Sequence, residues 1–280
     1  MKWVTFHPEF YTIEANKLLL PEGEGVNYRE RELRTLLKSI LVILITISLT
    51  LLTACDQGAN GQPDSLRIFF IGNSLTYTND LPGMLQKLLE QADINAVVES
   101  AALPNYGLQD HWANPDTVQR IADGNWDVVV LQQGPSATEG RPSLLEYSKM
   151  FNDFITQAGS RTALYMVWPW ESRSFDFDGV SESYRMAAEQ VDGLLFPAGE
   201  AWRAAWRKDP NLGLYGPDDF HPSELGTYLA ALVMYEQLAK KDPRQLPASI
   251  PTSSGERSIP ENVATILQES AVEANEEFAR

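Results

Sequence analysis

Short, continuous apolar runs alternate with longer segments of helical periodicity over most of this chain. Val128–Leu131 is wholly apolar, and Leu66–Ile71 contains a single charged residue. Such runs are typical of strands that are buried on both faces, as in a parallel sheet. The full set of strand candidates is Leu66–Ile71, Ala96–Ser100, Asp127–Gln132, Thr162–Trp168 and Gly193–Phe196.

Apolar residues at helical spacing fill the segments between these strand candidates. Strands that alternate with helices predict an α/β fold, here a three-layer α/β/α sandwich with a five-stranded, mostly parallel sheet. After the last strand we expect a long helix, a surface loop over Asp242–Arg257 and a final amphipathic helix. The expected helices are Leu81–Ala92, Asp110–Ala122, Leu144–Ala158, Ser181–Val191, Pro222–Leu238 and Glu261–Phe278.

The region ahead of the first strand has the pattern of an export signal followed by a tether. Basic residues precede the apolar run of residues 36–55, which ends Leu-Thr-Ala-Cys. This pattern is typical of a secretory signal, and its end resembles a bacterial lipoprotein lipobox with Cys55 as the lipidated residue. A transmembrane anchor is the alternative, although the run is shorter than the ~20 residues that a spanning helix needs.

These features divide the chain into four parts. Residues 1–35 mix acidic and basic groups, unlike a short basic n-region, so we expect a non-native extension with translation starting near residues 26–36. Residues 36–55 are the signal peptide, residues 56–65 a polar tether, and residues 66–280 one folded domain. We therefore expect a protein that is lipid-anchored at Cys55 to a bacterial membrane, in the cell envelope outside the cytoplasm.

Composition restricts the partners and cofactors of this domain. The formal net charge is −16 and no basic stripe is present, so we expect no nucleic-acid partner. Cys55 is the only cysteine, which rules out an intrachain disulfide. No Cys/His or acidic cluster has metal-ligand spacing, and no glycine-rich phosphate loop occurs, so we expect no metal and no other cofactor. We expect a monomer.

Two short segments at opposite ends of the predicted domain carry groups for nucleophilic catalysis. The first strand runs directly into Gly72-Asn73-Ser74-Leu75-Thr76, and Asp218-Asp219-Phe220-His221 precedes the last long helix of the sandwich. A serine hydroxyl attacks an ester only when a base takes its proton, and a carboxylate orients that base. The two segments therefore predict covalent acyl transfer. The alternative is structural: a turn that caps a helix, and aspartates at a helix entry.

Both segments resemble conserved blocks of the SGNH (GDSL-type) hydrolase superfamily. The Ser74 segment resembles the first block, with Asn73 in place of the usual aspartate, and Asp218-x-x-His221 resembles the last. The resemblance covers residues 66–240, because the order of elements also fits. It implies a three-layer α/β/α hydrolase domain in which Ser74 is the nucleophile, His221 the base and Asp218 the orienting carboxylate. Asp219 is the competing carboxylate.

The resemblance also indicates which groups donate hydrogen bonds to the oxyanion. Besides the Ser74 N–H, the family uses a glycine after the second strand, for which Gly107 is the best match. Its third donor is an asparagine in a Gly-x-Asn block, but this chain has Gln132-Gln133-Gly134 there. The Gln-Gly pair resembles the block of carbohydrate acetylesterases, so we expect one of the two glutamine amides to donate. An incomplete oxyanion hole in a slow or lost enzyme is the alternative.

Two further residues are candidates for the substrate pocket. His111 follows Asp110 at the start of a predicted helix, where we expect it to line the pocket edge or to cap the helix. Trp168 ends the fourth strand at the same sheet edge, and its ring would suit a sugar ring or an acyl chain. A tryptophan packed in the core is the alternative.

These residues together predict a serine esterase that hydrolyses acetyl or other small esters, with a carbohydrate as a candidate alcohol part. Two other functions are compatible with the same sequence. One is a non-catalytic, glycan-binding lipoprotein that retains the fold. The other is a lipase or thioesterase, which differs in preferring longer acyl groups.

Overall fold

A computed structural model describes residues 65–279 of the protein, so the export signal, Cys55 and most of the tether lie outside the described residues. Five strands form one sheet in the order β2-β1-β3-β4-β5, and every neighbouring pair is parallel. The strands are β1 (Leu66–Gly72), β2 (Ala96–Ala102), β3 (Val128–Leu131), β4 (Arg161–Tyr165) and β5 (Leu194–Phe196).

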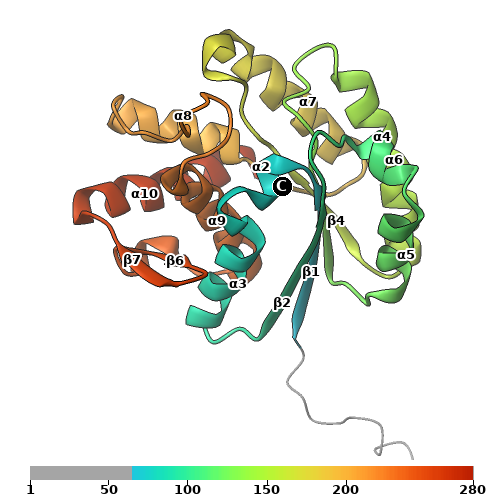
Figure 1. The fold of residues 1–280 in the computed structure, drawn as a ribbon, viewed down its shortest axis with the longest axis horizontal. Coiled ribbons are helices and arrows are strands. Elements are labelled where there is room, and N and C mark those ends of the chain that lie inside the picture. Colours follow the sequence, from blue (N-terminus) through green and yellow to red (C-terminus); the bar gives the residue numbers. More distant parts are fainter. Residues whose placement is uncertain (1–64, 280) are drawn as a thin grey trace, which may run out of the picture. The chain divides into compact units, whose positions relative to one another are not determined.

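Helices cover both faces of this sheet (Figure 1). One layer contains α3 (Leu81–Gln91), α8 (Ala198–Lys208), α9 (Glu224–Ala239) and α10 (Glu261–Phe278), and the other contains α4 (Leu108–Trp112), α5 (Pro115–Asp123), α6 (Arg141–Gln157) and α7 (Phe177–Gln190). The short helix α2 (Ser74–Tyr77) follows β1 directly, and 3₁₀ turns occupy Thr78–Asp80, Glu171–Asp176 and Pro243–Gln245. The predicted α/β/α sandwich is confirmed.

The core lies between the sheet and its two helical layers. Residues of the central strands, such as Phe70, Val130 and Leu164, have no exposed surface. Continuous burial on both faces explains why these strands are apolar runs rather than alternating patterns. Helix α9 is apolar on nearly all sides for the same reason, because it packs against α3, α8 and α10.

Two predicted elements differ from the structure. The expected helix over residues 110–122 is two helices, because Asn114 is extended and caps a new helix that has Pro115 at its first position. The expected loop over residues 242–257 contains a 3₁₀ turn and an antiparallel hairpin of β6 (Ser249–Thr252) and β7 (Gly255–Ser258). Gly255 has φ +129°, a conformation that L residues rarely adopt, which permits the tight turn. Within residues 65–279 no helix is long and apolar enough to span a bilayer.

The strand order determines where a ligand site can lie. The chain leaves β1 toward β2 on one side of the sheet and later returns to add β3 on the other side. In sheets of this kind, ligands bind outside the carboxyl ends of the strands at such a switch point. Ser74 follows β1, and Gln132 follows β3 directly, so both lie at that edge.

Candidate active site

Ser74 lies at a tight strand-to-helix turn between β1 and α2. Asn73 is extended, and its side chain caps α2 by accepting a hydrogen bond from the Leu75 N–H at 3.1 Å. Gly72 has no room for a side chain, because a Cβ there would lie 2.3 Å from Thr76 Oγ1 and 2.4 Å from Gln132 Oε1. The turn therefore depends on a glycine, and it places the serine hydroxyl at the first position of a helix.

The structure brings Ser74, His221 and Asp218 into one hydrogen-bonded chain. Ser74 Oγ is 2.8 Å from His221 Nε2, and His221 Nδ1 is 2.5 Å from Asp218 Oδ2. An Nδ1–H that donates to the carboxylate leaves Nε2 free to accept the serine proton. The hydrogen bond from His221 also lowers the pKa of the Asp218 carboxyl, so this group stays ionised at neutral pH.

Asp218 also shapes the turn that presents His221. Its Oδ1 accepts hydrogen bonds from the backbone N–H groups of Phe220 at 3.2 Å and His221 at 2.9 Å. The next residue, Asp219, has φ +59° and lines a neighbouring cavity. The carboxylate that contacts the histidine is therefore Asp218.

The loop of residues 215–222, hereafter the histidine loop, is closed at its base. Tyr215 and Pro222 form an isolated antiparallel bridge, and the Gly216 N–H donates to the His221 carbonyl at 2.7 Å. The side chain of Trp168 donates from Nε1 to the Phe220 carbonyl at 3.0 Å. These contacts hold the imidazole opposite a serine that is 147 residues earlier in the chain.

Trp168 is a core residue, and its predicted place in the substrate pocket is wrong. The side chain has no exposed surface and stacks on Trp202 with a centroid distance of 3.6 Å. It acts on the site through its hydrogen bond to the histidine loop. The residue lies beyond the last residue of β4, in a buried segment that packs under that loop, which the strand pattern does not reveal.

His111 is also wholly buried, so its predicted place at the pocket edge is wrong. Its Nε2–H donates to the Gly72 carbonyl at 2.7 Å, and its Nδ1 lies 3.3 Å from Thr117 Oγ1. Burial lowers the pKa of this imidazole, which favours the neutral ring. His111 therefore ties α4 to the end of β1 and supports the Ser74 turn from behind.

The Ser74 N–H has no hydrogen-bond partner among residues 65–279, as an oxyanion donor requires.

Gly107 differs from the prediction. Its N–H donates to the Asp110 carboxylate at 2.8 Å, at the start of α4. The Gly107 amide is therefore engaged and does not point freely at an oxyanion.

Both glutamine side chains are also engaged, which corrects their predicted part in the oxyanion hole. Gln132 Oε1 accepts from the Asn73 N–H at 2.9 Å and from Thr76 Oγ1 at 2.8 Å, while its Nε2 donates to Asn73 Oδ1 and to the Gln133 carbonyl. Gln132 thus uses its whole amide group to hold the Ser74 turn. Gln132 was predicted as a candidate donor, but its link to Asn73, 59 residues earlier in the chain, was not predicted.

Gln133 fastens the opposite side of the site. Its Oε1 accepts from the Leu108 N–H at 3.3 Å, and its Nε2 donates to Ser136 Oγ at 2.8 Å and to the Gly140 carbonyl at 3.3 Å. The side chain therefore joins the start of α4 to the loop that follows β3. The backbone carbonyl of Gln133 accepts a hydrogen bond from the hydroxyl of Tyr184 at 2.7 Å, which extends the connection to α7.

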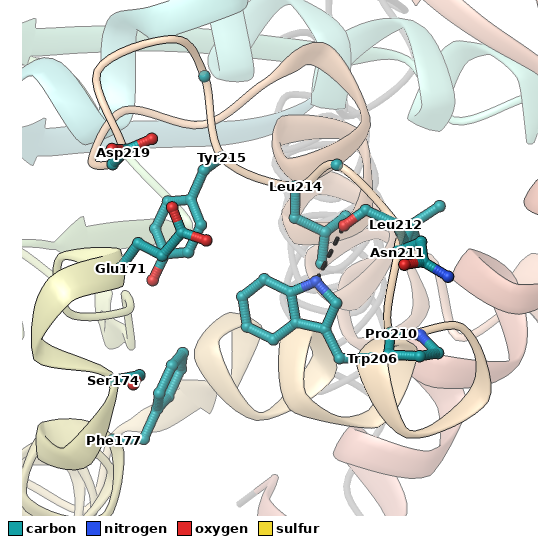
Figure 2. Close-up of a pocket in the computed structure, with 12 residues that line it drawn as sticks. Glu171, Ser174, Phe177, Trp206, Pro210, Asn211, Leu212, Leu214, Tyr215 and Asp219 are labelled. Atoms are coloured by element: carbon teal, nitrogen blue, oxygen red, sulfur yellow. Dashed lines mark hydrogen bonds between the residues drawn. The ribbon is translucent and has the colours of Figure 1, made fainter.

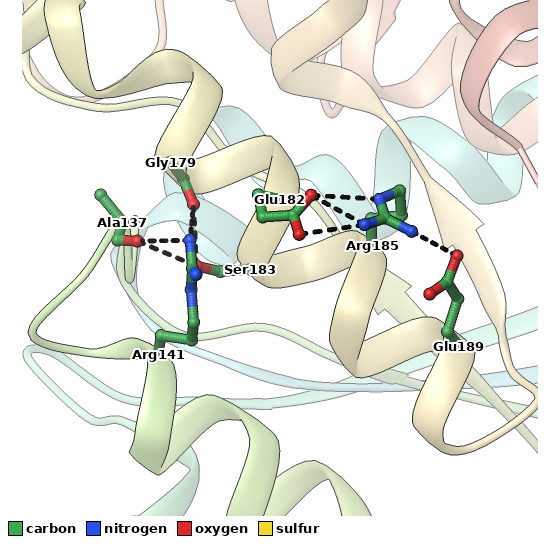
Figure 3. Close-up of polar contacts among 7 residues, drawn as sticks. All are labelled: Ala137, Arg141, Gly179, Glu182, Ser183, Arg185 and Glu189. Carbon is green, nitrogen blue, oxygen red and sulfur yellow. Dashed lines mark hydrogen bonds and ion pairs between the residues drawn. The ribbon is translucent and has the colours of Figure 1, made fainter.

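Arg141 anchors the far end of the loop after β3, as Figure 3 shows. Its Nε donates to Ser183 Oγ at 2.8 Å, and its Nη2 donates to the carbonyls of Ala137 at 3.1 Å and Gly179 at 3.3 Å. Ser183 Oγ also contacts the Ala137 carbonyl, at 3.1 Å. The loop is thus pinned at both ends, by Gln133 near β3 and by Arg141 at α6.

A cavity of about 500 Å³ lies beside the histidine loop (Figure 2). Its walls carry the carboxylates of Glu171 and Asp219 and the rings of Phe177, Trp206 and Tyr215. Trp206 donates from Nε1 to the Leu212 carbonyl, the hydrogen bond that Figure 2 marks, at 2.9 Å. Neither Ser74 nor His221 lines this cavity. Within residues 65–279, no group of three or more His, Cys, Asp or Glu side chains is placed to hold a metal ion.

No family model matches this sequence, and no curated protein matches it. The solved structures that are similar in fold include three described below. A protein from Slackia heliotrinireducens, provisionally assigned as an SGNH hydrolase, is 27% identical with a TM-score of 0.54, over 62% of this chain and 98% of that one. A DUF4886 family protein from Bacteroides uniformis is 17% identical with a TM-score of 0.64, over 76% of this chain and 96% of that one. An acetyl xylan esterase is 16% identical with a TM-score of 0.51, over 61% of this chain and 99% of that one.

Proposed function

Because this chain belongs to the SGNH hydrolase superfamily and is a serine hydrolase, we propose that it removes acetyl groups from a carbohydrate ester by a Ser-His-Asp mechanism. The observation that carries the proposal is the hydrogen-bonded chain from Ser74 Oγ through the His221 imidazole to the Asp218 carboxylate. Its two distances, 2.8 and 2.5 Å, are those of a nucleophile, a base and an orienting group ready for proton transfer.

In the proposed reaction, Ser74 Oγ attacks the ester carbonyl carbon while its proton passes to His221 Nε2. The Asp218 carboxylate stabilises the imidazolium that forms. Collapse of the tetrahedral intermediate breaks the bond to the alcohol oxygen, which leaves with the proton from His221. A water molecule then attacks the acyl-enzyme with the same histidine as base, which releases the acid and restores Ser74.

The oxyanion of each intermediate would be held first by the Ser74 N–H, the donor without a partner among the described residues. The two glutamines would act by positioning: Gln132 holds the turn that carries this donor, and Gln133 holds the start of α4. The choice of a carbohydrate acetyl ester rests on the Gln133-Gly134 pair, which resembles the block of carbohydrate acetylesterases.

A series of p-nitrophenyl esters tests the acyl preference. We expect the purified protein to hydrolyse the acetate fastest, with kcat/KM falling through the butyrate to the octanoate, and we expect Ser74→Ala to abolish hydrolysis of all three. A rate that rises with acyl length would instead support the lipase or thioesterase function. A wild-type protein that hydrolyses none of them would support the non-catalytic glycan-binding lipoprotein.

The proposed location is the outer face of a bacterial membrane, with the domain tethered through lipid on Cys55. The motif Leu52-Thr53-Ala54-Cys55 supports this proposal. In cells grown with labelled palmitate, Cys55→Ser should lose the label and accumulate as uncleaved precursor, whereas Ser74→Ala should be labelled like the wild type. Unchanged labelling of Cys55→Ser would contradict the lipid anchor.

A further inference from the structure

Among residues 65–279, three large apolar side chains are exposed, and all three lie in segments at the carboxyl edge of the sheet. They are Tyr77, Trp170 and Phe175, with exposed fractions of 42%, 44% and 76%. Tyr77 ends α2, the helix that begins at Ser74, while Trp170 and Phe175 lie between β4 and α7. Trp170 is in contact with the histidine loop, through the ring of Phe220.

Trp170 is held close to the candidate base by ring stacking. Its indole lies 4.1 Å from the ring of Phe220, with an interplanar angle of 12°, and the Phe220 ring lies 5.3 Å from the imidazole of His221. One face of the indole is therefore covered by Phe220. Because the side chain is nevertheless 44% exposed, its other face is open to a ligand.

The backbone around Trp170 is fastened to the histidine loop on both sides. The Tyr215 hydroxyl donates to the Pro169 carbonyl at 2.7 Å, and the Glu171 N–H donates to the Asp219 carbonyl at 2.9 Å. A flat ring that is fixed before binding loses little conformational freedom when a ligand stacks on it. The indole is thus a preorganised platform, and its position relative to His221 is set by the same loop.

A cavity of about 200 Å³ adjoins the indole, between the loops that follow β3 and β4. It is smaller than the roughly 300–1,000 Å³ of pockets that enclose drug-sized ligands. Its polar lining comprises Ser136, Glu139, Arg173 and Asp176, and Arg173 Nε lies 2.5 Å from Asp176 Oδ2. An alkyl chain placed here would desolvate these charged groups without replacing their hydrogen bonds with water. A hydroxyl-bearing ring would replace them.

We propose that the open face of Trp170 stacks against a sugar ring in the alcohol part of the substrate, and that the charged side chains of the adjoining cavity bind the hydroxyl groups of that ring. The inference rests on the proposed esterase function and identifies the residue that would recognise its carbohydrate. Carboxylates at Glu139 and Asp176 accept hydrogen bonds from hydroxyls, and the Arg173 guanidinium donates to them. An anionic lipid surface is a poor alternative partner, since the net charge of the chain is −16.

The test compares sugar esters with an ester whose alcohol part has no ring. Hydrolysis of a panel of glucose and xylose monoacetates and of vinyl acetate is followed by acid release for the wild type, Trp170→Ala, Trp170→Phe and Phe175→Ala. Loss of one stacked ring should raise KM for the best sugar monoacetate about tenfold in Trp170→Ala. Its kcat/KM for that ester should fall about tenfold further than its kcat/KM for vinyl acetate. Trp170→Phe should recover most of the difference, and Phe175→Ala, on the same segment, should show none.

Equal losses for sugar and vinyl esters in Trp170→Ala would overturn the inference, because they would mean that the indole only positions the histidine loop. No change for either ester would overturn it as well. Calorimetric titration of Ser74→Ala with the sugar monoacetates separates this inference from the proposed function. If Ser74→Ala binds the sugar monoacetates and the Ser74→Ala/Trp170→Ala double variant does not, Trp170 is a sugar-binding residue. This result holds even where the wild type hydrolyses no ester. If neither protein binds them, the platform is absent.

Discussion

Replacing Ser74 with alanine should lower kcat for ester hydrolysis by about 10⁴–10⁶-fold, the scale measured when a member of a catalytic triad is removed. His221→Ala and the Ser74→Ala/His221→Ala double variant should fall to the same residual rate. The losses should not add, because proton transfer from Ser74 Oγ to His221 Nε2 is one event that needs both groups. Steady-state kinetics with p-nitrophenyl acetate measure all three.

The two neighbouring aspartates provide a matched control for this result. Asp218→Ala should lose somewhat less than Ser74→Ala, because an imidazole without its orienting carboxylate can still accept a proton. Asp219→Ala should stay close to the wild type, since Asp218 is the carboxylate at 2.5 Å from His221 Nδ1. A larger loss in Asp219→Ala than in Asp218→Ala would show that the wrong carboxylate has been assigned.

Replacing Gln132 with alanine should destabilise the protein by about 3 kcal/mol, since it leaves two buried donors unpaired. The Asn73 N–H and the Thr76 hydroxyl would lose Gln132 Oε1, and Asn73 Oδ1 would lose Gln132 Nε2. All of these groups belong to the turn that carries Ser74, so kcat should fall as well. Urea unfolding followed by circular dichroism gives the stability, and kcat is measured at a temperature where the variant is folded.

Gln133→Ala is the control for Gln132→Ala. Its side chain bonds to the Leu108 N–H, to Ser136 and to the Gly140 carbonyl, outside the Ser74 turn. We expect a smaller destabilisation, about 1–2 kcal/mol. A loss of kcat in Gln133→Ala without any loss of stability would contradict the positioning role and restore this amide as an oxyanion donor.

The sheet was predictable because each strand can be identified from its own local run of apolar residues. A run such as Val128–Leu131 has no polar residue, which is typical of a short strand covered on both faces. Ser74, Asp218 and His221 were predictable for a different reason. Their chemistry constrains residue type and short-range spacing, so Asp218 and His221, three residues apart, share one turn in which the carboxylate reaches both the imidazole and the backbone.

The rest of the site depends on contacts between distant segments. Trp168 is buried against Trp202, 34 residues away in the chain. His111 is buried with its hydrogen bond to the Gly72 carbonyl, 39 residues away. The Gln132 side-chain amide forms hydrogen bonds with residues about 60 positions earlier in the chain. A local sequence pattern does not reveal partners so far away in the chain. The position of Trp168, His111 and Gln132 near this sheet edge was therefore predictable, but their roles there were not.

The nucleophile can be identified directly with a fluorophosphonate probe, followed by peptide mapping of the modified residue by mass spectrometry. The account predicts a single modification, on Ser74, that disappears in Ser74→Ala and is strongly reduced in His221→Ala, because the probe reacts only with a serine whose proton is removed by a base. A wild-type protein shown to be folded by circular dichroism that takes no label, or that is labelled on another serine, would contradict it.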